Sequence, residues 1–206
     1  MPLPYRTHRR LCPRLFLLLA TLLLTSAPTQ AVILTVATEA ELVAAIQAVN
    51  SAVVGTHSIT LATDITLTAA PTPLNNPAAA ELLIDGNGHT LDGNGHGPVL
   101  SVAAGTTARV REITVTGGAA TDGAGIFNLG ALTIEESRIT RNVATGRGGG
   151  VFNSASLSVK DSTIDGNFAD EGGAVAMLAH DADASLTLLD GGIAGNAAGS
   201  GTGLPL

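Results

Sequence analysis

Aromatic residues and cysteines are almost absent from this sequence. Its 206 residues include no tryptophan, one tyrosine, one cysteine and four phenylalanines. The tyrosine and the cysteine lie within the first 31 residues, and the rest of the chain keeps only Phe127, Phe152 and Phe168. A fold stapled by disulfides is therefore excluded, and the core must be built from Ile, Leu, Val and Ala.

Basic residues are scarce as well, and the formal net charge of the chain is −7. Four of the ten basic side chains lie in residues 1–31, so the remaining chain would carry 6 basic and 17 acidic side chains, a net charge of −11. A domain of this charge repels the phosphates of nucleic acids and of anionic lipids. We therefore expect no nucleic-acid partner.

Residues 1–31 have the three parts of a secretory signal peptide. Four arginines precede the apolar run Leu15 to Leu24, and a polar stretch of small residues ends at Ala31. The run is shorter than the roughly 20 residues that a spanning helix needs, so no transmembrane segment is expected after cleavage. An uncleaved N-terminal anchor is the alternative. We predict export, with Val32 as the mature N-terminus and a secreted or cell-surface location.

A phrase of about 25 residues is repeated in the second half of the chain. "DGAGIFNLGALTIEESRITRN" (122–142) is followed by "GRGGGVFNSASLSVKDSTIDGN" (146–167), and the matched positions lie 25 residues apart. A third copy occupies residues 171–196 with the insertion "LAHDAD", and a fainter copy precedes the first. A period of 20 to 50 residues indicates a solenoid, a propeller or an array.

The pattern inside each copy distinguishes these architectures. Segments such as "ALTIEES" and "SLSVKDS" alternate apolar and polar residues, which is typical of short, half-buried strands. No copy contains a stretch with helical spacing, and a propeller blade needs about 40 residues. The sequence therefore predicts an all-β parallel β-helix with about 25 residues per coil, in which equivalent residues stack about 4.8 Å apart.

Asparagines recur at fixed places in the repeats. Asn142, Asn167 and Asn196 each end one copy, and Asn128 matches Asn153. Asparagine tolerates the left-handed backbone conformation of turns, and its amide can form hydrogen bonds along a stack. We predict that these five residues form structural ladders. The neighbouring "GRGGG" lacks the Lys-Ser/Thr of a phosphate-binding loop, so we interpret it as a second turn.

The segment before the repeats is predicted to form a helix that caps the solenoid. Thr38 and Glu41 have the spacing of a capping box, and the apolar residues that follow recur on one helical face. A helix here would cover the open end of the first coil. We divide the chain into a signal peptide (1–31), an N-terminal strand and capping helix (32–56), coils (57–199) and a flexible tail (200–206).

The motifs of residues 35–199 resemble those of a known family. "GGGVFN" with "STIDGN", and "GAGIFN" with "SRITRN", look like the repeats of polymorphic outer-membrane proteins and related bacterial β-helix proteins. The resemblance implies a right-handed, single-stranded parallel β-helix of the pectin lyase-like kind, displayed at the outer membrane or as an autotransporter passenger. From this sequence we expect neither the barrel nor the anchor that retains such proteins at a surface.

Two acidic patterns are candidates for a metal site. "DGNGHTLDGNGH" (85–96) repeats Asp, Asn and His seven residues apart, but tight turns explain it without a metal. Carboxylates also occupy equivalent positions in successive repeats, at Glu112, Glu136, Asp161 and Asp190. Such a stack repels itself, and a hard cation such as Ca²⁺ would relieve the repulsion. We favour an outward, solvated row without a cofactor, with Ca²⁺ as the alternative.

An enzymatic interpretation rests on the same scaffold. Pectate-lyase-like helices resemble this one and typically use Asp-bound Ca²⁺ with an Arg or Lys base. Arg138 and Arg141 would be the candidates for the base, but neither recurs beside a clear carboxylate cluster. No Trp or Tyr remains after residue 31 to form a sugar-stacking platform.

The sequence therefore predicts a secreted or surface-exposed, non-catalytic scaffold of the adhesin or passenger type. Its alternative is a pectate-lyase-like polysaccharide lyase or hydrolase. An extracellular protein or a glycan surface is the expected partner. The last coil lacks an evident cap, so we also expect a fragment of a longer protein, or end-to-end association through unpaired strand edges.

Overall fold

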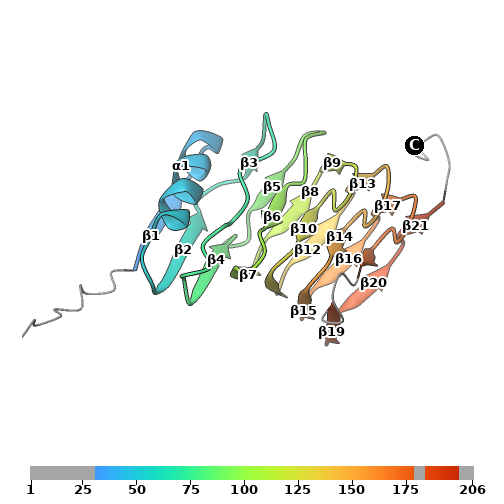
Figure 1. Ribbon diagram of the computed structural model, residues 1–206. Coiled ribbons are helices and arrows are strands. Elements are labelled where there is room, and N and C mark those ends of the chain that lie inside the picture. The colour runs from blue at the N-terminus through green and yellow to red at the C-terminus, as the bar shows by residue number, and fades with distance from the viewer. Residues whose placement is uncertain (1–30, 179–183, 200–206) are drawn as a thin grey trace, which may run out of the picture.

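The computed structural model describes residues 31–178 and 184–199, and these form a parallel β-solenoid of about six turns (Figure 1). One helix, α1 (Glu39–Asn50), lies near the N-terminus. The predicted all-β parallel β-helix with about 25 residues per coil is confirmed. Residues 1–30 of the predicted signal peptide, the predicted tail at 200–206 and most of the "LAHDAD" insertion lie outside the described residues.

Four parallel sheets form the walls of the solenoid, numbered here in the order in which one coil visits them. The first sheet contains β1 (Ile33–Val36), β2 (Thr56–Leu61), β4 (Glu81–Asp85), β7 (Thr107–Arg111), β11 (Ala131–Glu135), β15 (Ser156–Lys160) and β19 (Ser185–Leu189). The second contains β3 (Ile65–Thr66), β5 (Thr90–Asp92), β8 (Thr114–Thr116), β12 (Arg138–Thr140), β16 (Thr163–Asp165) and β20 (Gly192–Ala194).

The other two walls are shorter. The third sheet contains β9 (Ala119–Ala120), β13 (Val143–Ala144), β17 (Phe168–Ala169) and β21 (Ala197–Ala198). The fourth contains β6 (Leu100–Val102), β10 (Ile126–Asn128), β14 (Val151–Asn153) and β18 (Val175–Met177). Each strand pairs with its equivalent one coil away, so the sequence repeat sets the register.

Alternation along each strand builds the core. In β11, Leu132 and Ile134 are at most 2% exposed, whereas the residues between and around them face outward. Ile134 is in register with Val110 on one side and Val159 on the other, and all three are buried. Stacked aliphatic columns of this kind form the interior, as the scarcity of aromatic residues in the sequence predicts.

The glycines after residue 147 are required by the stacking of coils. A Cβ atom at Gly149 would lie 2.2 Å from the carbonyl oxygen of Phe168, and one at Gly150 would lie 2.6 Å from that of Ala174. Side chains at these two positions would collide with the backbone of the next coil. The "GRGGG" segment is thus a structural turn between the third and fourth sheets.

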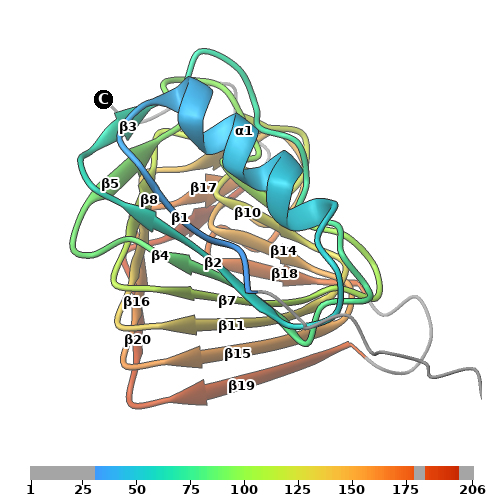
Figure 2. The same ribbon diagram turned by 90° about the vertical axis from the view of Figure 1, so that its left-hand side faces the viewer.

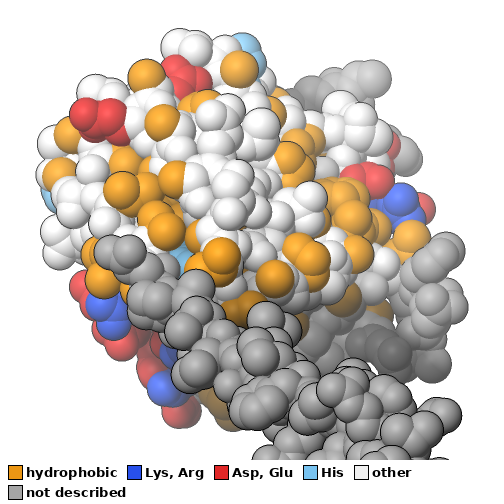
Figure 3. Space-filling model, turned by 60° about the vertical axis from the view of Figure 1, so that its left-hand side comes forward, with side chains coloured by type: hydrophobic (Ala, Val, Ile, Leu, Met, Phe, Trp, Pro, Cys, Tyr) orange, Lys and Arg blue, Asp and Glu red, His pale blue; other side chains and the backbone are white. Residues whose placement is uncertain are grey.

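Helix α1 covers the N-terminal end of the solenoid (Figure 2). The expected capping box is present, because Thr38 Oγ1 accepts a hydrogen bond from Glu41 N and the Glu41 side chain accepts one from Thr38 N. The helix buries its apolar face, formed by Leu42, Ala45, Ile46 and Val49. In a space-filling view from near this end, apolar side chains are scattered among polar ones, and basic side chains lie beside acidic ones (Figure 3).

Candidate functional site

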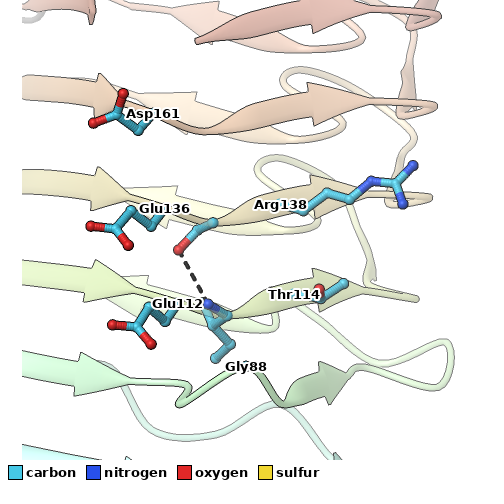
Figure 4. Close-up of a pocket in the computed structure, with 8 residues that line it drawn as sticks. Gly88, Glu112, Thr114, Glu136, Arg138 and Asp161 are labelled. Carbon is cyan, nitrogen blue, oxygen red and sulfur yellow. Dashed lines mark hydrogen bonds between the residues drawn. The ribbon is translucent and has the colours of Figure 1, made fainter. Parts of the chain in front are cut away.

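The four predicted acidic residues lie at one corner of the solenoid. Glu112, Glu136, Asp161 and Asp190 each follow a strand of the first sheet directly, at the turn into the second sheet. Each has a positive φ, between 47° and 50°, which few residues other than glycine adopt. We call these four residues the acidic column. In Figure 4, the labelled Glu112, Glu136 and Asp161 project side by side in the same direction.

Buried serine hydroxyls support this corner from within. Ser137 Oγ accepts a hydrogen bond from Ile113 N at 3.3 Å, the contact dashed in Figure 4, and donates one to Glu135 O at 2.6 Å. Ser162 repeats the arrangement one coil further, where its Oγ accepts from Ser137 N at 3.0 Å. The sequence analysis missed this ladder, although both serines follow an acidic residue at the 25-residue spacing.

An open hollow of about 440 Å³ lies beside the acidic column. Its polar lining comes from Glu112, Thr114, Glu136, Ser137, Arg138 and Asp161. Glu136 and Asp161 are exposed to solvent, while Glu112 is half-buried. Within the described ranges, no three His, Cys, Asp or Glu side chains come together in a group that could hold a metal ion. The carboxylates therefore form a row along the surface rather than a convergent cage.

The first candidate base, Arg138, is already engaged. Its Nε and Nη2 atoms donate hydrogen bonds to the two carboxylate oxygens of Asp165, at 2.8 and 2.6 Å. This bidentate pair raises the pKa of Arg138 and lowers that of Asp165. In Figure 4 the guanidinium points away from the acidic column. Arg138 is thus a charged donor fixed to a neighbouring coil, and not a proton acceptor beside the hollow.

The second candidate, Arg141, sits at a different kind of turn. It has a φ of 55° and precedes Asn142 at the end of a second-sheet strand. Neighbouring coils place Gly117 and Gly166 at the same position, with φ of 66° and 62°. The backbone of this corner thus needs a left-handed residue, which glycine supplies at the least cost.

The asparagines after these left-handed residues are linked through the interior. The side-chain oxygen Oδ1 of Asn167 accepts hydrogen bonds from both N and Nδ2 of Asn142, each at 3.0 Å. Asn167 N and Nδ2 donate in turn to the side-chain oxygen of Asn196, again at 3.0 Å. Asn167 and Asn142 are at most 1% exposed. This chain of amides satisfies polar groups that would otherwise be buried without partners.

A shorter link of the same kind joins the fourth sheet to the first. Asn128 Nδ2 donates to Asn153 Oδ1 at 2.7 Å, and both residues are fully buried. Asn153 Nδ2 donates to backbone oxygens of Ala155 and Ser185. In the described part of the chain, every buried side-chain nitrogen or oxygen has a hydrogen-bond partner.

Ion pairs tie the coils together on the outside. Arg109 bridges Glu81 and Glu135 at 3.1 and 2.9 Å, which spans three coils of the first sheet. Arg111 donates to Asp85 through Nη2 at 2.6 Å, and this bond raises the pKa of Arg111 more than the attraction of Glu112 does. Asp85 also accepts a hydrogen bond from Asn87 N, so its oxygens serve a turn and an ion pair.

A comparison with family models gives one match. Residues 33–170 match the model described as "Putative pectate lyase-like adhesive domain". Neither the curated proteins nor the solved structures yielded a match to the chain. The described residues contain no helix with the length and apolar character needed to cross a membrane.

Proposed function

Because this chain belongs to the pectate lyase-like adhesive domain family, we propose that it is a non-catalytic, adhesin-like scaffold. The bidentate pair between Arg138 and Asp165 carries the proposal, since it engages the candidate base that lines the hollow beside the acidic column. Arg109, Arg111 and Arg147 likewise pair with carboxylates of neighbouring coils. A rigid solenoid of this kind presents an extended wall for contact.

The adhesive role is testable with beads coated with the full chain. Beads should be retained on immobilised glycans or extracellular proteins more strongly than beads coated with an unrelated acidic protein. The acidic control is needed because the net charge of −7 alone could cause nonspecific retention on basic surfaces. Equal retention of the two kinds of bead would refute the adhesive role.

One observation favours the second candidate function, a pectate-lyase-like polysaccharide lyase. Glu112, Glu136 and Asp161 of the acidic column line an open hollow, and their carboxylates are the candidate ligands for a Ca²⁺ ion there. We expect no unsaturated product from polygalacturonate with or without Ca²⁺, and a melting temperature that sub-millimolar Ca²⁺ leaves unchanged. A Ca²⁺-dependent product that Glu136→Gln and Asp161→Asn remove would establish the lyase instead.

We also propose that the chain is exported and displayed at a bacterial surface. The basic and apolar pattern of residues 1–31 supports export, and the likeness to polymorphic outer-membrane repeats supports display in the manner of a passenger. Exported material should begin at Val32 when its mass is measured. A mass that retains Met1 would contradict cleavage and favour an uncleaved anchor.

We further propose that the partners include a second copy of this chain. Leu188, Leu189 and Ile193, in the last described coil, are 42–48% exposed, and the opposite end is covered by helix α1. Contact through the exposed coil would then be tail to tail, a two-fold arrangement that closes at a dimer. Sizing should give a dimer that Ile193→Lys converts to a monomer, and a wild-type monomer at high concentration would exclude this contact.

A further inference from the structure

The outer face of the fourth sheet carries the only aromatic stack among the described residues. Phe127 and Phe152 are the outward residues of β10 and β14 and are register partners. Their rings are stacked, with centroids 5.0 Å apart and an interplanar angle of 10°. Arg147 lies over the Phe152 ring, with Cζ 4.9 Å from its centroid. Phe152 is 3% exposed, whereas Phe127 remains half-buried.

The stack stops abruptly on the N-terminal side of Phe127. The register partner of Phe127 in β6 is Ser101, whose side chain is far smaller than a phenyl ring. An open hollow of about 620 Å³ lies there, and both Ser101 and Phe127 line it. Since neighbouring coils are about 4.8 Å apart, a ring placed beside Ser101 in this hollow would lie at stacking distance from Phe127, as Phe152 does on the other side. We call the hollow the Phe127 slot.

The rim of the slot is polar but carries no net charge. Ser101, Thr121 and Asp122 contribute hydroxyl and carboxylate groups to its lining. The Asp122 carboxylate pairs with Arg147, through Nη2 at 2.9 Å and the backbone N at 2.8 Å. The hydrogen bond from Arg147 lowers the pKa of Asp122, so the pair stays charged and mutually neutralised. Asp122 is still 21% exposed, which leaves room for a further donor.

We propose that the Phe127 slot binds a neutral pyranose ring of a glycan. A pyranose has a flat face of C–H groups, which suits the face of Phe127, and an edge of hydroxyls, which suits the rim. A charged uronic acid would gain nothing from the neutral pair at the rim. An aromatic side chain from a protein would fill the slot but leave the rim hydroxyls and carboxylate without partners. The proposal names a ligand class for the adhesive role proposed above and rests on it.

Saturation-transfer NMR on the full chain tests the slot directly. The probes are the methyl glycosides of glucose, galactose and mannose, with N-acetyltyrosine amide as the aromatic competitor. We expect at least one glycoside to receive saturation at its ring C–H protons. Phe127→Ala removes the platform, and Ser101→Phe fills the slot with a third ring, so each should abolish that signal.

The matched control is Ser158→Phe, which adds the same ring to the outer face of the first sheet. It should leave the glycoside signal unchanged, and an unchanged melting temperature of Ser101→Phe should show that this variant is folded. Absence of signal from every glycoside with wild type, or a signal that survives both slot variants, overturns the proposal. Saturation of the tyrosine amide alone also overturns it and assigns the slot to a protein partner.

The bead assay separates this proposal from the adhesive role. Glycan retention that persists in Ser101→Phe beads would mean that the chain is adhesive through another surface and that the slot proposal is wrong. Conversely, a glycoside signal that both slot variants abolish, without any bead retention, would support the slot and refute the adhesive role.

Discussion

At the N-terminal end of the solenoid, Ile46 of helix α1 is 1% exposed, whereas Ile193 in the last described coil is 43% exposed. Both are inward-facing isoleucines at an end of the stack of coils. The N-terminal one belongs to an element that lies across the first coil (Figure 2). Ile193 instead continues the column of Ile164, its register partner, which is 0% exposed.

This difference shows that the inward side chains of a coil are buried only when a neighbouring element covers them on both sides. Ile164 and Ile193 occupy the same place in the repeat, and only Ile164 has a described coil on both sides. The strand pattern therefore predicts which side chains face inward, but burial depends on the neighbours. Helix α1 provides such a neighbour with four apolar side chains, and no described element does so for the last described coil.

The largest effect should come from truncating isoleucine at each end. Ile46→Ala leaves a cavity beneath the helix and should lower the free energy of unfolding by about 2 to 5 kcal/mol. Ile193→Ala removes less buried surface and should cost under about 1 kcal/mol at a protein concentration where the chain is monomeric. Denaturant melts measure both. Equal losses would mean that the two ends are equally packed.

The second comparison uses the asparagine ladder. Asn167 is bonded to Asn142 and Asn196, so Asn167→Ala strands buried groups and should cost about 1 to 3 kcal/mol. Asn196→Ala should cost less, because Asn196 is only half-buried and water can take the place of its amide. Asn167→Ala and Asn196→Ala would be compared by thermal melts. Matching, negligible shifts would remove the energetic argument for the ladder.

The fold could be predicted from the sequence because the repeat indicates both the architecture and the contacts between coils. The 25-residue spacing between Phe127 and Phe152, or between Asn142 and Asn167, predicts that the two residues of each pair are stacked neighbours. The capping helix could be found from a local pattern as well, because Thr38 and Glu41 need only each other. Neither inference required knowledge of distant contacts.

The candidate site was harder to predict, because it depends on side-chain geometry between coils. The carboxylates at 112, 136 and 161 were placed in one row from spacing alone, but their positive φ could not be read that way. The serine ladder behind them was missed, although Ser137 and Ser162 share the 25-residue spacing. Likewise, nothing in the local sequence of Arg138 indicates that Asp165, 27 residues away, holds its guanidinium. The Phe127 slot exists because the register partner of Phe127 in the neighbouring coil, Ser101, has a small side chain. No motif in the sequence singles out Ser101.

A third test concerns helix α1, which covers the N-terminal end of the solenoid but not the last described coil. Thr38→Ala removes the hydroxyl that accepts a hydrogen bond from Glu41 N and should lower the stability of helix α1 by about 1 kcal/mol. Thr38→Ser keeps the hydroxyl and should cost a fraction of that. The loss should also speed hydrogen exchange in residues 39–50 while leaving the exchange of β19 and β20 as it was. Equal acceleration in β19 and β20 would show that the cap acts on the whole solenoid.

The smallest expected effect is a pH dependence confined to the capped end. Glu39 accepts hydrogen bonds from Thr68 N and Oγ1, each at 2.8 Å, and these lower its pKa below the ordinary value of 4.5. A lowered carboxyl pKa contributes stability that is complete above the unfolded value and is lost as the pH falls through the folded value.

Acid should therefore loosen helix α1 below about pH 4.5, and Glu39→Gln should show less of this change than wild type. The effect is small because Glu39 is only half-buried and water screens its interactions. Carboxylates elsewhere, such as Asp122 and Asp165, also have lowered pKa values, so global melts alone would mix their contributions. Hydrogen exchange of residues 39–50 between pH 6 and pH 3, wild type against Glu39→Gln, isolates the local part. Identical profiles would show that the contact between Glu39 and Thr68 does not hold the cap in place, and that the buried face of Leu42 and Ile46 does so alone.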